Sequence, residues 1–342
     1  MSDLTSSRGR RLCLQPDNVV NLKWSPSTFD PPREAILRRS GFSEEVTMII
    51  AQITDLHVVA KNRLCYRKVP TNAQLAQSIV HINSLDPRPD AVIASGDLTD
   101  HGRPEEYDLL REILSDLIPP VFVIPGNHDR RDVLLKAFAS EDYMPPPDAP
   151  FVNYAIDRYP LRLIGLDTSV PEHHHGMMCE ERLRWLDDTL SARPDCPTLI
   201  FMHHPPFRTG VQWMDASGLR GGRMMEKIVR RHRQIVRVAC GHIHRPIHLA
   251  WGGTIASTSP STCHQVSLNL TEQNGFEFTM EPRAVQLHVW DDSYGLISHL
   301  SYVPAGYEEV AMLSSLTDEA RAKLLAQNRL DYQELCKSEY DR

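Results

Sequence analysis

Side chains that bind metal ions follow five predicted strands, each at the point where the strand ends. The segments are ITDLH, ASGDLTDHG, IPGNHD, FMHHPP and ACGHIH, and they contribute Asp55, His57, Asp97, Asn127, His128, His203, His242 and His244. In open α/β sheets ligands bind beyond the carboxyl ends of the strands, so these turns should converge on one site. Carboxylate, amide and imidazole donors without a thiolate suit iron, manganese, zinc or cobalt.

The motifs differ in how specific they are. Asp55 and His57 alone would most often be a turn carboxylate beside a surface imidazole. The Gly-His-x-His motif that ends at His244 is sharper, because a chain of this composition yields it by chance only roughly 0.04 times. Gly, Asn and Asp are preferred turn residues, so the Gly-Asp and Gly-Asn-His-Asp motifs are weak taken singly. Their joint occurrence in this order, each after an apolar strand, predicts a metal site.

The ordered set D-x-H, G-D-x-x-x-x-G, G-N-H-D, H-H-P-P and G-H-x-H resembles that of the calcineurin-like metallophosphoesterases. The resemblance covers residues 50 to about 265 and implies an α/β fold, a four-layer α/β/β/α sandwich of two mixed sheets flanked by helices. It implies a di-metal site at the carboxyl ends of the strands. One metal would be bound by Asp55, His57 and His244, the other by Asn127, His203 and His242, with Asp97 as the bridge.

The resemblance also implies a mechanism. Two divalent cations about 3.5–4 Å apart hold a bridging water and clamp the oxygens of an in-line displacement. Coordination lowers the pKa of that water toward about 7, which supplies the attacking hydroxide at neutral pH. His128 would contact the phosphate together with Asn127 and protonate the leaving alkoxide as general acid. Asp100 corresponds to a residue that orients this histidine in some relatives, and His264 to one beside the substrate pocket.

Segments such as LDTSVPEHHHG and PSTCHQV are most similar to the bacterial class III cyclic-nucleotide and glycerophosphodiester phosphodiesterases. In related protein phosphatases an arginine follows G-D-x-x-D and helps hold a phosphate dianion, whereas His101 stands here. Losing a guanidinium weakens the binding of a monoester more than that of a diester, which carries one charge. We therefore expect a phosphodiesterase acting on a small molecule. A phosphomonoesterase or nucleotidase on the same metals, and a non-catalytic scaffold of the same fold, remain as alternatives.

The elements that must position these residues alternate between strand and helix from Met48 to His244. The predicted strands are MIIAQITD, DAVIASGD, VFVIPGNHD, LRLIGLDTS, PTLIFMHH and IVRVACGH, and the predicted helices are TNAQLAQSIVHINSL, PEEYDLLREILSDL, CEERLRWLDDTL and GRMMEKIVRR. Further strands are expected at GTIASTS, CHQVSLNL, FEFTM, AVQLHVW and YGLISHLSYV. The predicted division is an irregular N-terminal extension (1–46), a catalytic domain (47–303) and a helical tail (304–342).

Composition narrows the class of protein further. The net charge of −7, without a basic stripe, argues against a nucleic-acid polymer as partner. No apolar run approaches the roughly 20 residues that span a bilayer. The 7 cysteines are scattered, odd in number and never in C-x-x-C spacing, so neither a disulfide framework nor a zinc knuckle is indicated. We expect a cytoplasmic protein, and the oligomeric state stays open, a homo-oligomer included.

Several other residues have plain structural interpretations. His204 follows a predicted ligand and is expected to orient the turn, and the histidines at 173–175 are equally consistent with a solvated loop and with a role at the site. Tyr66 and Arg67 lie in the loop after the first strand, where a plain surface loop is favoured over a position lining the pocket. The Met and Trp residues at helical spacing, such as Trp185, are expected in the core.

Overall fold

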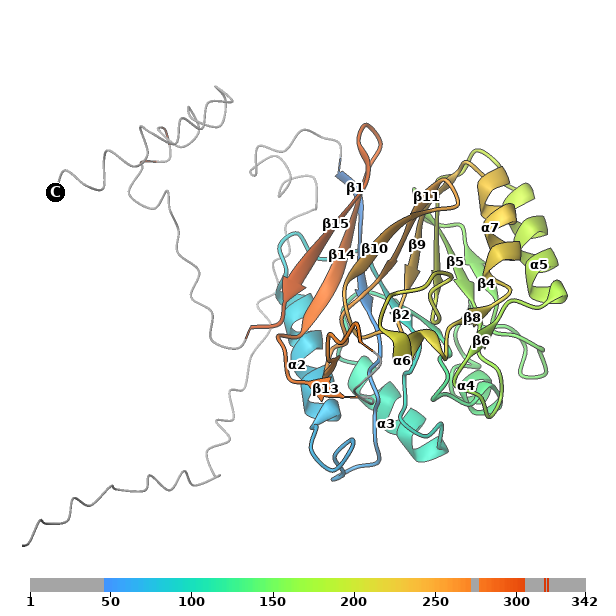
Figure 1. The fold of residues 1–342 in the computed structure, drawn as a ribbon. Helices are drawn as coiled ribbons and strands as arrows, with labels where there is room; N and C mark the ends of the chain where they lie inside the picture. Colours follow the sequence, from blue (N-terminus) through green and yellow to red (C-terminus); the bar gives the residue numbers. More distant parts are fainter. Residues whose placement is uncertain (1–45, 272–276, 305–316, 318, 320–342) are drawn as a thin grey trace, which may run out of the picture. The chain divides into compact units, whose positions relative to one another are not determined.

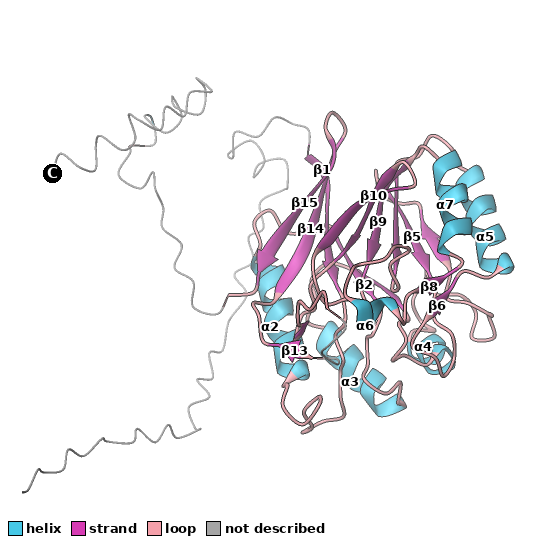
Figure 2. Ribbon diagram, in the orientation of Figure 1, coloured by secondary structure: helices cyan, strands magenta, loops and turns pink. Residues whose placement is uncertain are grey.

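The structure, a computed structural model, describes residues 46–271, 277–304, 317 and 319. Two mixed β-sheets face each other, and helices cover the outer face of each sheet (Figures 1 and 2). This four-layer arrangement confirms the predicted fold class. Among the described residues, no helix combines the length and apolar character that a membrane crossing requires. Residues 1–45 of the predicted extension and most of the predicted tail lie outside the described residues.

The first sheet has the strand order β15-β14-β1-β2-β3. Its strands are β1 (Val46–Ile53), β2 (Ala91–Ser95), β3 (Val121–Ile124), β14 (Ala284–Asp291) and β15 (Gly295–Tyr302). Strands β1, β2 and β3 are parallel, whereas β14 is antiparallel to both β1 and β15. The outer face is covered by the helices α2 (Thr71–Ser84), α3 (Pro104–Leu114) and α4 (Arg131–Ala137).

The second sheet has the order β10-β11-β9-β7-β5-β4. Its strands are β4 (Tyr154–Ile156), β5 (Arg162–Leu166), β7 (Thr198–Met202), β9 (Ile235–Cys240), β10 (Ile247–Trp251) and β11 (Thr254–Thr258). Strands β5, β7, β9 and β11 are parallel, and the two edge strands are antiparallel to their neighbours. Helices α5 (Glu180–Ser191) and α7 (Gly222–Arg231) cover its outer face.

Strand β7 of the second sheet is apolar on both faces because both faces are covered. In β7, Leu199 and Phe201 join the core that lies against the first sheet, whereas Ile200 and Met202 join the core under α5 and α7. Successive side chains of a strand point to opposite faces, so a continuous apolar run fills both layers. The same reasoning explains why PTLIFMHH is a central strand.

The short elements differ most from the sequence expectation. Strand β12 (Gln265–Val266) pairs with β13 (Phe278–Thr279), β6 (Gly176–Met177) pairs with β8 (Leu219–Arg220), and α6 spans Gln212–Asp215. The predicted strand CHQVSLNL is correct only for the two residues of β12. Beyond it, the side chains of Leu268 and Leu270 are exposed, so the apolar alternation there covers no core. Strands β4 and β10 and helix α4 were not predicted.

The carboxylate of Asp129, which is partly buried, ties the turns that follow β2 and β3 to helix α3. Its oxygens accept hydrogen bonds from the backbone N–H groups of Leu98 (2.9 Å), Thr99 (3.1 Å) and Gly126 (2.9 Å). They also accept from the hydroxyls of Thr99 (3.0 Å) and Tyr107 (2.8 Å). Five donors therefore depend on one side chain.

We predict that Asp129→Asn lowers the free energy of unfolding by about 2–4 kcal/mol, because an amide replaces one acceptor oxygen with a donor and leaves inward-facing N–H groups unpaired. Urea denaturation measures the change. The matched control is Asp132→Asn, which alters an exposed carboxylate paired only with the exposed Arg130 and should shift stability by less than about 0.5 kcal/mol. Equal denaturation midpoints for the two variants would show that Asp129 is not structurally important.

Candidate metal centre

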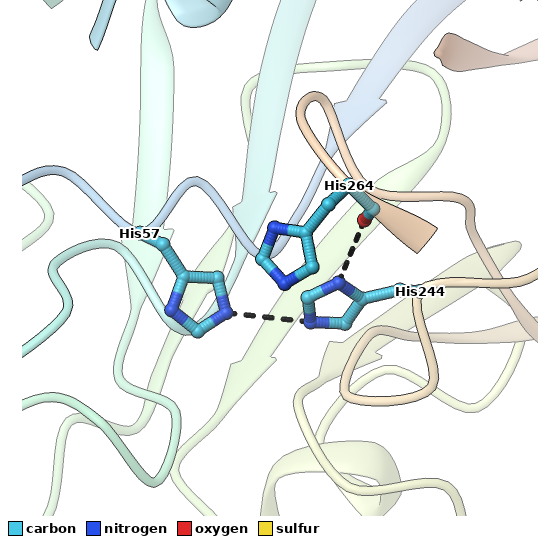
Figure 3. Close-up of side chains that lie close together, drawn as sticks. All are labelled: His57, His244 and His264. Carbon is cyan, nitrogen blue, oxygen red and sulfur yellow. Dashed lines mark hydrogen bonds between the residues drawn. The ribbon is translucent and has the colours of Figure 1, made fainter. Parts of the chain in front are cut away.

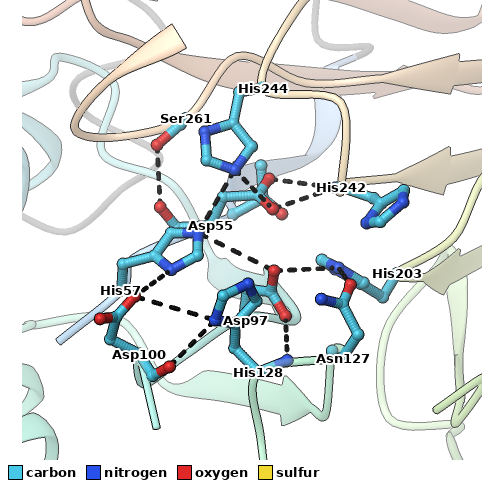
Figure 4. Close-up of polar contacts among 12 residues, drawn as sticks. Asp55, His57, Asp97, Asp100, Asn127, His128, His203, His242, His244 and Ser261 are labelled. Carbon is cyan, nitrogen blue, oxygen red and sulfur yellow. Dashed lines mark hydrogen bonds and ion pairs between the residues drawn. The ribbon is translucent and has the colours of Figure 1, made fainter. Parts of the chain in front are cut away.

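The five predicted turns meet at one place, where the two sheets present the carboxyl ends of their parallel strands (Figure 4). The turns after β1, β2 and β3 come from the first sheet, and those after β7 and β9 come from the second. The residues brought together are Asp55, His57, Asp97, Asn127, His128, His203, His242 and His244. All of them are buried except Asn127 and His128, which are partly exposed.

Five of the predicted ligands have a backbone that L-residues adopt rarely. The φ angles of Asp55, His57, Asp97, His242 and His244 are 52°, 45°, 48°, 71° and 52°. A left-handed conformation costs a non-glycine residue roughly 1–2 kcal/mol. Such strain is retained where the surrounding structure imposes it, most often at functional sites. The strain here coincides with the residues that the motifs single out.

The glycines of two motifs are required by close packing around the centre. A Cβ atom at Gly96 would collide with the ring of His203, and Gly96 also has a positive φ of 94°. A Cβ atom at Gly126 would collide with the backbone and carboxylate of Asp97. These two positions explain why glycine precedes Asp97 and Asn127 in the sequence.

Asp97 lies between two groups of donors. One of its oxygens is 3.3 Å from His203 Nε2 and 3.8 Å from His57 Nε2, and the other accepts the backbone N–H of His128 (2.9 Å). On one side, His57 Nε2 and His244 Nε2 are 3.3 Å apart, and His244 Nε2 is 3.3 Å from a carboxylate oxygen of Asp55. On the other, His203 Nε2 is 3.1 Å from Asn127 Oδ1.

The outer nitrogen of each histidine has a fixed acceptor. The Nδ1–H group of His57 donates to Asp100 Oδ1 (3.0 Å). That of His203 donates to Ser95 O (2.9 Å), and that of His244 donates to His264 O (2.9 Å). His242 is the reverse case, because its Nε2 is 3.2 Å from the hydroxyl of Ser217, which itself donates to Met214 O. In His57, His203 and His244 the other nitrogen, Nε2, is left facing the centre, as in histidines that bind metals.

These donors fit divalent cations on both sides of Asp97. On one side, the lone pairs of His57 Nε2 and His244 Nε2 face each other at 3.3 Å. On the other side, His203 Nε2 faces the oxygen lone pairs of Asn127 Oδ1 at 3.1 Å and Asp97 Oδ2 at 3.3 Å. Without a cation only protons relieve this repulsion. Burial opposes charging of His203, but the Asp97 carboxylate dominates and raises its pKa to about 9. Burial likewise opposes charging of His244, yet Asp55 raises its pKa above the ordinary value.

His128 lies at the edge of the centre with 24% of its side chain exposed. Its Nδ1–H donates to the backbone carbonyl of Asp100 (2.9 Å), which leaves Nε2 as the nitrogen available to a bound molecule. Burial disfavours the imidazolium, but Asp97 and the Asp100 carbonyl raise the pKa of His128 above its ordinary value. The Asp100 carboxylate itself contacts His57 rather than His128, which is 3.8 Å away. Asp100 therefore holds both histidines, through different atoms.

His264 lies beside His57 and His244 at the edge of the centre (Figure 3). Its ring centroid is 4.7 Å from that of His244 and 5.4 Å from that of His57, and its Nε2 is buried without a hydrogen-bond partner. Burial, with His244 and His57 nearby, lowers its pKa to about 2, so the ring is neutral. The ring of Tyr66 meets it edge-on at 5.4 Å. Tyr66 thus packs against the centre while its side chain is partly exposed, which agrees with the second of the two positions considered for its loop.

The histidines beside the centre were singled out in the sequence, whereas Ser217 has no signal there. His204 is buried, with Nδ1 2.8 Å from Thr168 Oγ1 and Nε2 3.1 Å from the backbone carbonyl of His174, so it fixes the turn as expected. His174 Nδ1 in turn lies 3.4 Å from the amide nitrogen of Asn127, and both His173 and His174 are exposed. Ser217, the partner of His242, belongs to a loop whose composition distinguishes it in no way.

Residues 48–246 match the family model described as calcineurin-like phosphoesterase. A probable glycerophosphodiester phosphodiesterase GpdQ from Arcobacter nitrofigilis is 40% identical over 257 residues, which cover 75% of this chain and 93% of that protein. A probable cyclic nucleotide phosphodiesterase from Rhodopseudomonas palustris is 33% identical over 67% of this chain and 84% of that protein. Among solved structures, the purple acid phosphatase PPD1 of yellow lupin aligns with a TM-score of 0.55 at 14% identity, covering 79% of this chain and 53% of that one. That likeness concerns the fold alone.

We predict that Asp97→Ala abolishes tight binding of both metals and nearly all hydrolytic activity, because both groups of donors face this carboxylate. Elemental analysis after dialysis measures the metal content, and manganese or cobalt should restore a chelated wild type but not the variant. The control Asp187→Ala removes a surface carboxylate paired with Arg231 and His232 and should keep the full metal content. Two metals per chain in the Asp97 variant would rule out a bridging role.

Proposed function

Since the chain belongs to the calcineurin-like phosphoesterase family, we propose that it hydrolyses small phosphate diesters at two divalent cations bound by the residues of this centre. The observation that carries the proposal is the set of inward-facing lone pairs on both sides of Asp97. A non-catalytic scaffold would not need donors arranged in mutual repulsion. The enzyme is a metal-dependent phosphodiesterase, as its relatives are named.

Each cation would have its own set of donors. Asp55, His57 and His244 would hold one, and Asn127, His203 and His242 the other, with Asp97 shared. Such cations polarise phosphoryl oxygens and lower the pKa of a coordinated water. The donor set, all nitrogen and oxygen, supports iron, manganese, zinc or cobalt.

The chain's own proton donor would be His128. Its Nδ1–H is engaged by the Asp100 carbonyl at 2.9 Å, so a second proton would be carried on Nε2. A raised pKa keeps that proton available near neutral pH, and partial exposure lets the ring reach a bound ester. Asp100 would act as a positioning residue, and Asn127 and His264 would contribute contacts to the substrate.

Position 101 supports a diester as substrate. His101 Nδ1 lies 3.3 Å from the Asp100 carboxylate and 3.2 Å from that of Glu106, and the backbone N–H of His101 also donates to Glu106. This side chain is thus held at helix α3, and it offers no guanidinium to a phosphate dianion. Identity of 40% with a glycerophosphodiester phosphodiesterase favours glycerophosphodiesters over cyclic nucleotides within this class.

A substrate panel on metal-reconstituted enzyme tests the proposal. We expect glycerophosphodiesters and bis(p-nitrophenyl) phosphate to be turned over with higher kcat/KM than p-nitrophenyl phosphate, and glycerophosphodiesters to exceed cyclic nucleotides. A preference for p-nitrophenyl phosphate would identify a monoesterase instead. If protein with two bound metals per chain turns over none of these esters, the chain is a non-catalytic scaffold of the same fold.

We predict that His128→Ala keeps both metals but lowers kcat for a glycerophosphodiester by about 10²–10⁴-fold, the usual contribution of general acid catalysis. An ester with a p-nitrophenol leaving group needs little protonation and should lose much less. The control His173→Ala changes an exposed loop histidine and should leave both rates unchanged. Equal losses for the two esters would assign His128 to binding or charge stabilisation, and lost metal would make it a ligand.

A further inference from the structure

The segment 167–175, which connects β5 to β6, contacts the Asn127 side of the centre at three points. Thr168 Oγ1 lies 2.8 Å from His204 Nδ1, and the backbone carbonyl of His174 lies 3.1 Å from His204 Nε2. The third contact joins His174 Nδ1 to the amide nitrogen of Asn127 at 3.4 Å. The placement of this segment therefore bears on the donors of one cation in particular.

The contact with His174 determines which end of the Asn127 amide faces the centre. An amide has one acceptor end and one donor end, and only the oxygen can bind a cation. The amide nitrogen donates to His174 Nδ1, and the oxygen consequently faces His203 Nε2 at 3.1 Å. With the amide reversed, two N–H groups would point toward the cation. His174 thus selects the orientation in which Asn127 can act as a ligand.

Arg131, the first residue of α4, holds the beginning of this segment. Its Nε donates to a carboxylate oxygen of Asp167, and a terminal nitrogen donates to the backbone oxygen and the hydroxyl of Ser169, each at 3.0 Å. The Asp167 side chain is fully buried, and 16% of the Arg131 side chain is exposed. The other Asp167 oxygen accepts the backbone N–H (2.8 Å) and the hydroxyl (2.7 Å) of Ser169. Because Arg131 follows Asn127 by four residues, the path from Asn127 through this ion pair to His174 closes on itself.

Arg182 of α5 holds both ends of the same segment. It donates to Ser169 O (2.7 Å) and to Met177 O (2.8 Å). Its guanidinium also lies 3.9 Å from the carboxylate of Asp167. Burial opposes the ionisation of Asp167, yet Arg131 and Arg182 lower its pKa below the ordinary value. Two guanidinium groups from different helices therefore share one carboxylate.

Such a network contributes direction more than stability. Removing charges from water costs about as much as their mutual attraction returns, so a buried ion pair adds little net stability compared with apolar packing. Its hydrogen bonds, in contrast, are all satisfied in only one arrangement of α4 and the segment. The exposed residues of the segment, 171–174, are thus held from both ends by buried groups.

We propose that Arg131 and Asp167 are positioning residues for the phosphodiesterase reaction, a role that rests on the proposed function. Their ion pair holds the segment where His174 can turn the Asn127 oxygen toward its cation. They act through His174 and the Asn127 amide, without contacting a metal themselves. The cation of the Asn127 donor set therefore depends on this ion pair, whereas the cation of the Asp55 donor set does not.

Calorimetric titration of metal-free Arg131→Met with manganese tests this role without depending on turnover. Loss of a group that orients a metal ligand typically weakens metal binding about 10–100-fold, so we expect one cation to bind more weakly by that factor and the other as in the wild type. Asn127→Ala identifies the affected cation, because it removes the ligand directly. The matched control Arg158→Met makes the same change in an exposed ion pair with Asp142 and should bind both cations as the wild type does.

A double-mutant cycle separates positioning from general destabilisation. In the Asn127→Ala background, Arg131→Met should weaken that cation by less than about 3-fold, because the group through which it acts is gone. A full additional loss in the double variant, or equal weakening of both cations in Arg131→Met, would show that Arg131 serves only the fold and would overturn the proposal. Unchanged affinities in Arg131→Met would do the same.

Arg131→Lys keeps the test decisive if Arg131→Met does not fold. A lysine retains the charge beside Asp167 but cannot bind Asp167 and Ser169 at once as the fork of a guanidinium does. We expect the Asn127 cation to bind about 3–10-fold more weakly in this variant, and unchanged affinity for both cations would refute the role. Wild-type protein that binds two cations but hydrolyses no ester would contradict the proposed function, whereas the differences in affinity would still report on Arg131.

Discussion

The carboxylate of Asp97 is the contact through which the two sheets form one site. It extends from the turn after β2 in the first sheet and faces His203 from the second, while its other oxygen holds the backbone of His128. A carboxylate buried to this degree needs positive partners, because desolvation alone would neutralise it. Burial does oppose its ionisation, but His203 and His128 nonetheless keep the pKa of Asp97 well below the ordinary value. The Asp97 carboxylate therefore agrees with three other features: the spacing of the sheets, the glycine at position 126 and the tautomers of the surrounding histidines.

The strained turns around Asp97 are supported by hydrogen bonds to one another. Asp55 N–H donates to Gly96 O (3.0 Å), His57 N–H donates to Asp97 O (3.0 Å), and Gly241 N–H donates to His203 O (3.0 Å). The turns thus continue the pairing of the parallel strands beyond the sheet itself. Left-handed backbone at the ligands is therefore stabilised by the strands, which are buried on both faces. Rigid elements hold the donors in place more accurately than independent loops would.

The sequence predicted the position of a residue correctly wherever that position depends on a single strand or helix. Each metal-binding motif directly follows an apolar run, and the carboxyl ends of parallel strands meet at one edge, so the predicted residues were brought together as expected. Asp129 and Ser217 were missed because their importance lies in contacts between segments far apart in the chain. Strands β4 and β10 are too short or too polar on one side for their pattern to indicate pairing. Arg237 interrupts the apolar segment IVRVAC, and its burial does not follow from the apolar pattern of the strand.

The charge around position 101 connects the local fold to the choice of substrate. Helix α3 begins with Pro104, and Glu106 reaches back to accept the backbone N–H groups of His101 (3.0 Å) and Arg103 (3.2 Å). This interaction draws the His101 ring toward two carboxylates, Glu106 and Asp100. A phosphate monoester dianion requires additional positive charge beyond the cations, whereas a diester monoanion requires less. The same contact that caps helix α3 therefore lowers the positive potential available to a dianion and favours diesters.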